Sequence, residues 1–210
     1  MTLVNRKLIK LNNRGVRNVS TFGSVNGGSM TFIKKITASS SGTISFLNGA
    51  SDVVLDSTYK EYLFTFKDVH PEEDNKKFTF QVDTGTNTNY NQTITSTAFS
   101  SSNSEPDDYT LFAYNGAEDQ AQGTAFQPLI VGTGNGNDES FAGYLHLFNP
   151  SGATHVKHFI ARFHTYHFEN IAFSLFTSGY INTTTALTRI QFKMLSGNID
   201  AGDICLYGIK

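Results

Sequence analysis

The sequence contains little cysteine, proline, tryptophan or charge. Its 210 residues include one cysteine, four prolines and no tryptophan, and charged residues make up 16%. The single thiol, Cys205, has no partner for an internal disulfide and cannot supply a multi-cysteine zinc site. No apolar run approaches the about 18 residues that a membrane-spanning helix needs, and the N-terminus lacks the pattern of a secretory signal. We therefore expect neither a disulfide scaffold nor insertion into a membrane.

The abundant residue types indicate β-structure. Phenylalanine (18 residues), tyrosine (9) and glycine (18) are common, and turn clusters separate short segments rich in aromatic residues and threonine. No segment has convincing helical periodicity, and 116–124 could form one helical turn at most. Turn signals every 10–15 residues or so predict an all-β fold, a jelly-roll-like antiparallel β-sandwich of about ten to twelve strands. The candidate strands are 30–36, 44–47, 59–66, 78–82, 91–97, 109–114, 126–131, 140–148, 154–168, 171–180, 186–195 and 199–209.

Alternation within these segments predicts which side chains form the core. Tyr62, Phe64 and Phe66 share one face of their strand, as do Ile190, Phe192 and Met194. Successive side chains of a strand point to opposite faces, so both sets should be buried. The segment 91–97 is polar throughout and is predicted to be an edge strand.

The first 51 residues carry bases and no acid, since the first acid is Asp52. A Gly/Ser-rich joint lies within this region at 23–29. We therefore divide the chain into a basic N-terminal arm (1–30) and a β-sandwich body (31–210). The arm is either a solvated end or an interaction segment. It has no aromatic residue among its bases before Phe22, which favours an acidic protein partner over nucleic acid. The candidate docking residues are Arg6, Lys7, Lys10, Arg14 and Arg17.

The C-terminal region resembles a known group of proteins. Its pattern is a strand at 187–192, the turn Ser196-Gly197-Asn198-Ile199-Asp200-Ala201-Gly202, and a last strand that ends Leu206-Tyr207-Gly208-Ile209. This is similar to the closing pattern of virion structural proteins of bacteriophages, common in marine cyanophages, and 59–66 and 143–147 are similar to their earlier strands. The resemblance spans about residues 32–209.

The resemblance implies a jelly-roll-like domain of a phage tail, fibre or capsid appendage, usually a trimer, and it brings no catalytic residue. An arm of 30 residues is short for a long-shafted fibre, so a small appendage docked through the arm fits better. Turn glycines at 197 and 202 would allow backbone angles that other residues avoid.

Five of the six histidines lie between His146 and His167. No two of them have the two-residue spacing that places imidazoles side by side on one strand face. The favoured interpretation is a set of polar positions on a solvent or subunit face. A metal site and a pH-sensitive interface are the alternatives.

A second motif is Asp83-Thr84-Gly85, which follows an apolar strand. It resembles the signature of aspartic proteases, whose chemistry needs two carboxylates and hence a homodimer here. The segment 129–132 could supply the apolar-apolar-glycine element of that family. The same three residues also make an ordinary turn, the interpretation that we favour.

Loops offer the remaining candidates. The acids at 72–74 and 105–108 could bind calcium, although solvated turns explain them better, and neither matches the spacing of the 12-residue calcium loop. The glycine-rich loop 132–137 lacks the lysine and helix of a phosphate cradle. Cys205 lies between apolar residues and is expected to be a packed side chain.

These observations predict an architectural protein and not an enzyme, with no metal or cofactor. We expect a bacteriophage virion component, located in the particle, that forms a homotrimer and docks onto other virion proteins through its arm. Contact with a glycan of the host surface is a further expectation. The alternatives are a glycan-binding, lectin-like module and, more remotely, a homodimeric aspartic protease acting through Asp83-Thr84-Gly85.

Overall fold

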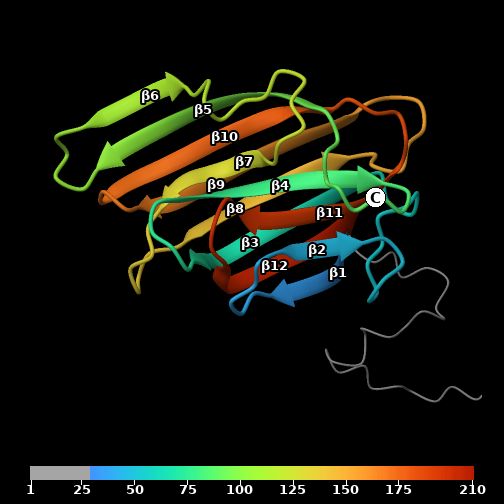
Figure 1. Cartoon of the computed structure of the whole chain (residues 1–210), viewed down its shortest axis with the longest axis horizontal. Coiled ribbons are helices and arrows are strands. Elements are labelled where there is room, and N and C mark those ends of the chain that lie inside the picture. The colour runs from blue at the N-terminus through green and yellow to red at the C-terminus, as the bar shows by residue number, and fades with distance from the viewer. Residues whose placement is uncertain (1–28) are drawn as a thin grey trace, which may run out of the picture.

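The computed structural model describes residues 29–210, which form twelve strands and no helix (Figure 1). None of these residues therefore forms a helix able to cross a membrane. The strands are β1 (Met30–Thr37), β2 (Ile44–Leu47), β3 (Glu61–Pro71), β4 (Lys76–Thr84), β5 (Ile94–Ser104), β6 (Thr110–Tyr114), β7 (Gln127–Thr133), β8 (Phe141–Phe148), β9 (Lys157–His167), β10 (Ile171–Ile181), β11 (Leu187–Met194) and β12 (Ile199–Ile209). The predicted docking bases of the arm lie outside the described residues.

The strands form two layers, and every pairing is antiparallel. The larger sheet has the order β1-β12-β3-β8-β9-β10-β5-β6, and the smaller sheet has the order β7-β4-β11-β2. A single pair, Thr133 with His167, joins the sheets through β7 and β9. The fold is thus an all-β, jelly-roll-like antiparallel sandwich, as predicted.

The core lies between the two sheets and consists largely of phenylalanines. Tyr62, Phe64 and Phe66 of β3 are buried, as their alternation predicts, and so are Ile190, Phe192 and Met194 of β11. Rings from opposite layers meet edge to face: Phe64 and Phe192 have their centroids 5.4 Å apart, and Phe66 and Phe78 5.5 Å apart. This is the preferred geometry of aromatic pairs.

The segment 91–97 was predicted to be an edge strand. Residues 94–97 pair with β10 on one side, and β6 pairs only with residues 99–103 of β5, so no strand among residues 29–210 pairs with the other side of 94–97. A loop covers that side: Ile94 forms an isolated bridge with Gly123, and the Ser96 amide donates to the Gln120 carbonyl over 2.9 Å. The buried Ser96 hydroxyl donates to the Gln127 amide oxygen over 2.7 Å. The polar segment thus has one strand neighbour, as predicted, and a loop in place of the second.

The C-terminal turn confirms the role expected of its glycines. Gly197 has a φ of +71° and Gly202 of +115°. A Cβ at Gly202 would also lie 2.6 Å from the Cα of Val69, so the close approach of β12 to β3 requires glycine. β12 then runs back between β1 and β3, and the Lys210 amide donates to the Ser29 carbonyl over 3.0 Å.

Candidate assembly surface

The outer face of the larger sheet carries a row of aromatic side chains across five strands. The registers place Tyr114 opposite Phe99, Phe99 opposite Phe176, Phe176 opposite Arg162, and Arg162 opposite Tyr144. Residues directly opposite one another in a sheet point to the same face. The row therefore runs from β6 to β8 on the side away from the core.

These outward side chains contact one another closely. The rings of Phe99 and Phe176 stack with their centroids 4.8 Å apart and their planes within 4°. The Arg162 guanidinium lies 4.8 Å above the Phe176 ring, and the Phe112 centroid is 5.5 Å from that of Phe99. Phe112 is nevertheless 73% exposed and Tyr114 59% exposed. The rings of this cluster therefore pack against one another within the sheet, while much of their surface stays exposed to solvent.

A second row extends the apolar surface to the other edge of the sheet. It joins Phe32 of β1 to Ile160 of β9 through Tyr207, Leu63 and His146. Phe32 and Ile160 are about half exposed. We call the two rows together the outer aromatic face; it comprises Phe32, Leu63, Phe99, Phe112, Tyr114, Tyr144, Ile160, Phe176 and Tyr207.

The strand β6 is the free edge of this face. Within residues 29–210 it pairs with β5 alone. Four of its five residues are exposed, and the strand contains no charge and no proline. Edge strands are normally protected by such residues or by a bulge, so β6 is an unprotected edge.

A groove lies on the opposite side of β6, where the larger sheet extends past the smaller one. It has a volume of about 540 Å³ and is lined by residues that include Ser100, Leu111, Phe173 and His167. Burial lowers the pKa of His167 below its ordinary value, although the nearby carboxylate of Glu169 opposes this shift. The groove thus combines apolar side chains with the partly buried imidazole of His167.

The histidines are distributed over both faces. His146, His158 and His164 point outward beside the outer aromatic face, where His146 lies 3.0 Å from a Glu61 carboxylate oxygen. His167 lines the groove instead. Among residues 29–210, no three histidine, cysteine or acidic side chains gather as a metal site would require. The pH-sensitive interface stays a prediction.

Asp83 has the contacts of a turn residue. Its buried carboxylate accepts hydrogen bonds from the backbone N–H groups of Thr84 and Tyr90, each 2.9 Å, and from the Gln92 side chain, 3.0 Å. Gly85 has a φ of +57°. The apolar segment that could complete a protease motif pairs elsewhere, because Ile130 lies opposite Phe78. The geometry matches the turn interpretation of Asp-Thr-Gly.

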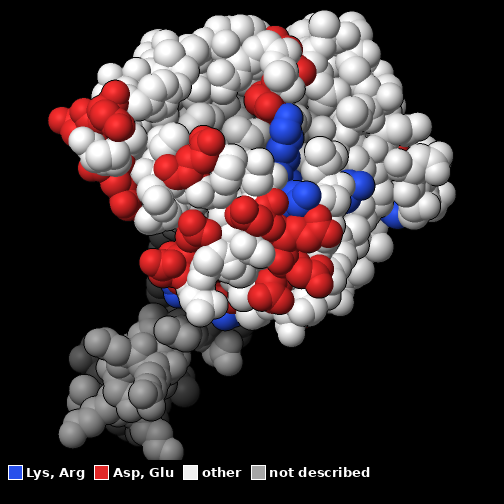
Figure 2. All heavy atoms as spheres, turned by 60° about the vertical axis from the view of Figure 1, so that its left-hand side comes forward, with Lys and Arg blue, Asp and Glu red and all other residues white. Residues whose placement is uncertain are grey.

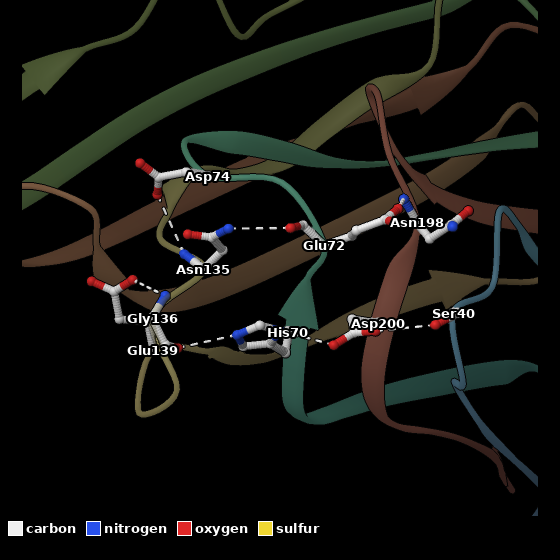
Figure 3. A network of polar contacts seen from close by, with 9 residues as sticks. All are labelled: Ser40, His70, Glu72, Asp74, Asn135, Gly136, Glu139, Asn198 and Asp200. Atoms are coloured by element: carbon white, nitrogen blue, oxygen red, sulfur yellow. Dashed lines mark hydrogen bonds and ion pairs between the residues drawn. The ribbon is translucent and has the colours of Figure 1, made fainter.

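The acidic loops gather at one end of the sheets, where Figure 2 shows several groups of carboxylates around a stripe of basic side chains. Figure 3 shows how some of them hold neighbouring loops together. His70 lies between the Gly136 carbonyl at 3.1 Å and the Asp200 carboxylate at 3.6 Å. Glu72 accepts from the Asn198 backbone N–H, and Asp74 from that of Asn135. These acids link the turns that follow β3, β7 and β11 through hydrogen bonds and an ion pair.

The glycine-rich loop 132–137 belongs to this network and contacts Glu72, Asp74 and Glu139 through its backbone and Asn135. Cys205 is half-buried on the outer side of β12, beside Thr65.

The sequence predicted β6 as a strand but did not reveal that it forms a free edge. Its exposed Leu111 and Phe112, on opposite faces, were the only local signal.

No known family accounts for this surface. No family model matches the chain, and no curated protein or solved structure is significantly similar to it.

Proposed function

We propose that the protein is a structural component of a bacteriophage particle that forms a homotrimer through its outer aromatic face. The basic arm would attach the subunit within the assembly. The observation that carries this proposal is the continuous outer aromatic face, which crosses the larger sheet and ends at β6, whose outer edge pairs with no strand among residues 29–210. The resemblance of the C-terminal strands to phage virion proteins supports the same assignment.

The character of the face favours a protein partner over solvent. Large contiguous apolar patches are uncommon on monomeric proteins and typically mark interaction sites. The enrichment in aromatic residues and one arginine is that of interface centres. Phe112 and Ile160 lie on opposite parts of the face and are 73% and 48% exposed. Contact with another subunit would remove this surface from water.

The oligomeric state tests the assembly. The native chain should have three times the chain mass by light scattering at micromolar concentration. Exchanging Phe112 and Ile160 for serine should produce monomers, because the loss of both apolar contacts weakens the interface. Leu195→Ser is the matched control, since Leu195 is 59% exposed but lies outside the outer aromatic face.

A trimer that survives the double substitution would contradict the proposed interface. A native monomer would contradict the proposed trimer and favour the glycan-binding alternative. A glycan array would then test that alternative. The virion assignment has its own test: peptides of this chain should be enriched in purified particles relative to the lysate, and their absence from particles would contradict it.

A further inference from the structure

Among residues 29–210, no strand pairs with the backbone groups along the free edge of β6. The Asn115 amide donates to the Ala98 carbonyl, and the Ser104 amide donates to the Tyr109 carbonyl. Because hydrogen-bonded positions alternate along an antiparallel strand, residues 109, 111, 113 and 115 bond to β5. The N–H and C=O groups of Thr110, Phe112 and Tyr114 therefore point away from β5, toward the open edge.

A strand added at this edge would gain side-chain contacts on both faces. On one side it would continue the outer aromatic face beside Phe112 and Tyr114. On the other side its alternate side chains would lie over the groove, next to Leu111, which is 44% exposed. Addition of an extended segment to an exposed sheet edge is a recurrent mode of recognition. The site therefore suits a segment that is apolar on both sides.

The charges around β6 indicate which segment it takes. Asp107 and Asp108 precede the strand, Asp119 follows it, and residues 78–156 contain no lysine or arginine. Glu118 also follows the strand, but it is buried and forms an ion pair with Lys77 over 2.7 Å. Antiparallel pairing of two β6 strands would bring the acids before one strand next to those after the other. Like charges in such positions repel, so a basic partner is favoured over a second β6.

The N-terminal arm contains a segment of matching character. Residues 3–11 have five aliphatic side chains and three bases, with no acid, glycine or proline. The bases are Arg6, Lys7 and Lys10. We propose that residues 3–11 of one copy bind in extended form along the free edge of β6 in the next copy. This proposal rests on the proposed trimer and names the partner of the docking bases.

Geometry favours exchange between copies. β1 and β6 are the opposite edges of the larger sheet, seven strand spacings or about 34 Å apart. The 17 residues 12–28 could span up to about 60 Å when extended. A path back to the same copy's β6 would cross the outer aromatic face, which the proposed trimer covers. Head-to-tail exchange around a threefold axis instead closes a ring.

Crosslinking between two differently substituted full-length chains tests the exchange. Both chains carry Cys205→Ser; one carries Ala113→Cys, and the other a cysteine at 7, 8, 9 or 10 in turn. Ala113 is half-buried and would occupy a non-hydrogen-bonded position toward the added strand, where opposite residues approach most closely. Mixed disulfides should form, with yields that alternate between successive arm positions. A cysteine at Leu195 in place of Ala113 is the control and should not crosslink.

The other outcomes overturn the proposal in distinguishable ways. A trimer without mixed disulfides leaves the proposed function standing and rejects the arm exchange. A disulfide formed only within a doubly substituted chain would show that the arm binds its own copy. Dominant crosslinking between two Ala113→Cys chains would show that β6 pairs with β6. A monomer in light scattering would reject the proposed trimer itself.

A matched pair of substitutions tests the backbone contact. Thr110→Pro removes an N–H that points to the open edge but none that bonds to β5, whereas Thr110→Ala keeps it. Proline should lower the yield of mixed disulfide about five- to tenfold, as expected for a lost hydrogen bond, and alanine should not. Equal yields in the two variants would exclude strand addition. Exchanging Arg6, Lys7 and Lys10 for glutamate should also lower the yield, and an unchanged yield would exclude the charge pairing.

Discussion

The two faces of the larger sheet use the same residue types for opposite purposes. The inner face of β3, β8 and β9 buries Phe64, Phe141 and Phe163 to 1% exposure or less. The outer face of the same sheet holds Phe99, Phe112 and Tyr144 with between 37% and 73% of their surface exposed. Composition therefore does not separate core from surface in this protein. What separates them is whether a second sheet lies on top.

The inner rings are enclosed on every side, whereas the outer rings contact only their neighbours in the same sheet. Phe192 meets Phe64, Phe66 and Phe78 within 5.9 Å. Phe99 meets Phe112 and Phe176 along the sheet and has no layer above it among residues 29–210. The comparison predicts that the inner face determines stability and the outer face determines association.

The largest expected effect is truncation of an inner ring. Phe192→Ala should lower the free energy of unfolding by about 3–5 kcal/mol, because it removes buried apolar surface and leaves a cavity. Phe99→Ala, measured below the association concentration, should lower it by less than about 1 kcal/mol. Denaturant titration of both variants measures the difference. Similar losses would mean that the outer cluster belongs to the stability core.

The second effect concerns a buried polar group of the smaller sheet. Asp83→Asn should destabilise the protein by about 1–3 kcal/mol, because one acceptor oxygen is replaced by a donor that faces backbone N–H groups. Asp52→Asn is the control, since Asp52 is exposed, and should change stability by less than about 0.5 kcal/mol. Thermal unfolding followed by circular dichroism provides the measurement. An unchanged melting temperature for Asp83→Asn would contradict the capping role.

The smallest effect is the pH dependence that His167 contributes at the groove. Burial lowers its pKa below the ordinary value of 6.5, so the unfolded chain binds this proton more readily than the folded protein does. The contribution of neutral His167 to the free energy of unfolding is fully present above pH 6.5. It is lost as the pH falls through the lowered pKa of the folded protein, and the free energy of unfolding changes by less than about 1.4 kcal/mol per pH unit.

Replacing His167 with phenylalanine retains a ring beside Phe168 and Phe173 but removes the titration. Stability of this variant between pH 7 and pH 5 should fall less steeply than that of the native chain. His155→Gln is the control, since His155 is exposed, and should keep the native slope. An unchanged slope in the phenylalanine variant would contradict the assignment to His167.

Much of the fold could be predicted because local patterns carry it. Each of the twelve strands overlaps a predicted one, and the alternation in 62–66 and 190–194 correctly identified the buried face. The turn glycines at 197 and 202 also have the backbone angles expected of them. The polarity of 91–97 agrees with its single strand neighbour among residues 29–210, but it does not show that the loop 120–123 covers the other side. Ser96 and Ser100 are buried through contacts with distant parts of the chain.

The candidate surface was less predictable, since it depends on register between strands far apart in sequence. Tyr114, Phe99, Phe176 and Arg162 come from four strands, and no spacing along the chain places them in one row. The same holds for Asp83, where the sequence left a catalytic and a turn interpretation open. Its three hydrogen-bond donors match the turn interpretation, and they come from residues that the motif itself does not single out.

The sequence by itself determined the all-β class, the strands and the inward face of the clearest of them, because side-chain alternation and turn chemistry act over a few residues. Only the tertiary structure decided that β6 is a free edge, that the outer aromatic residues form one surface and that acidic loops meet at one end. These features follow from long-range pairing, in which the burial of a phenylalanine core selects one register and one strand order. The same register and strand order fix the positions of the side chains on the outer face, independently of the pattern of those residues in the sequence.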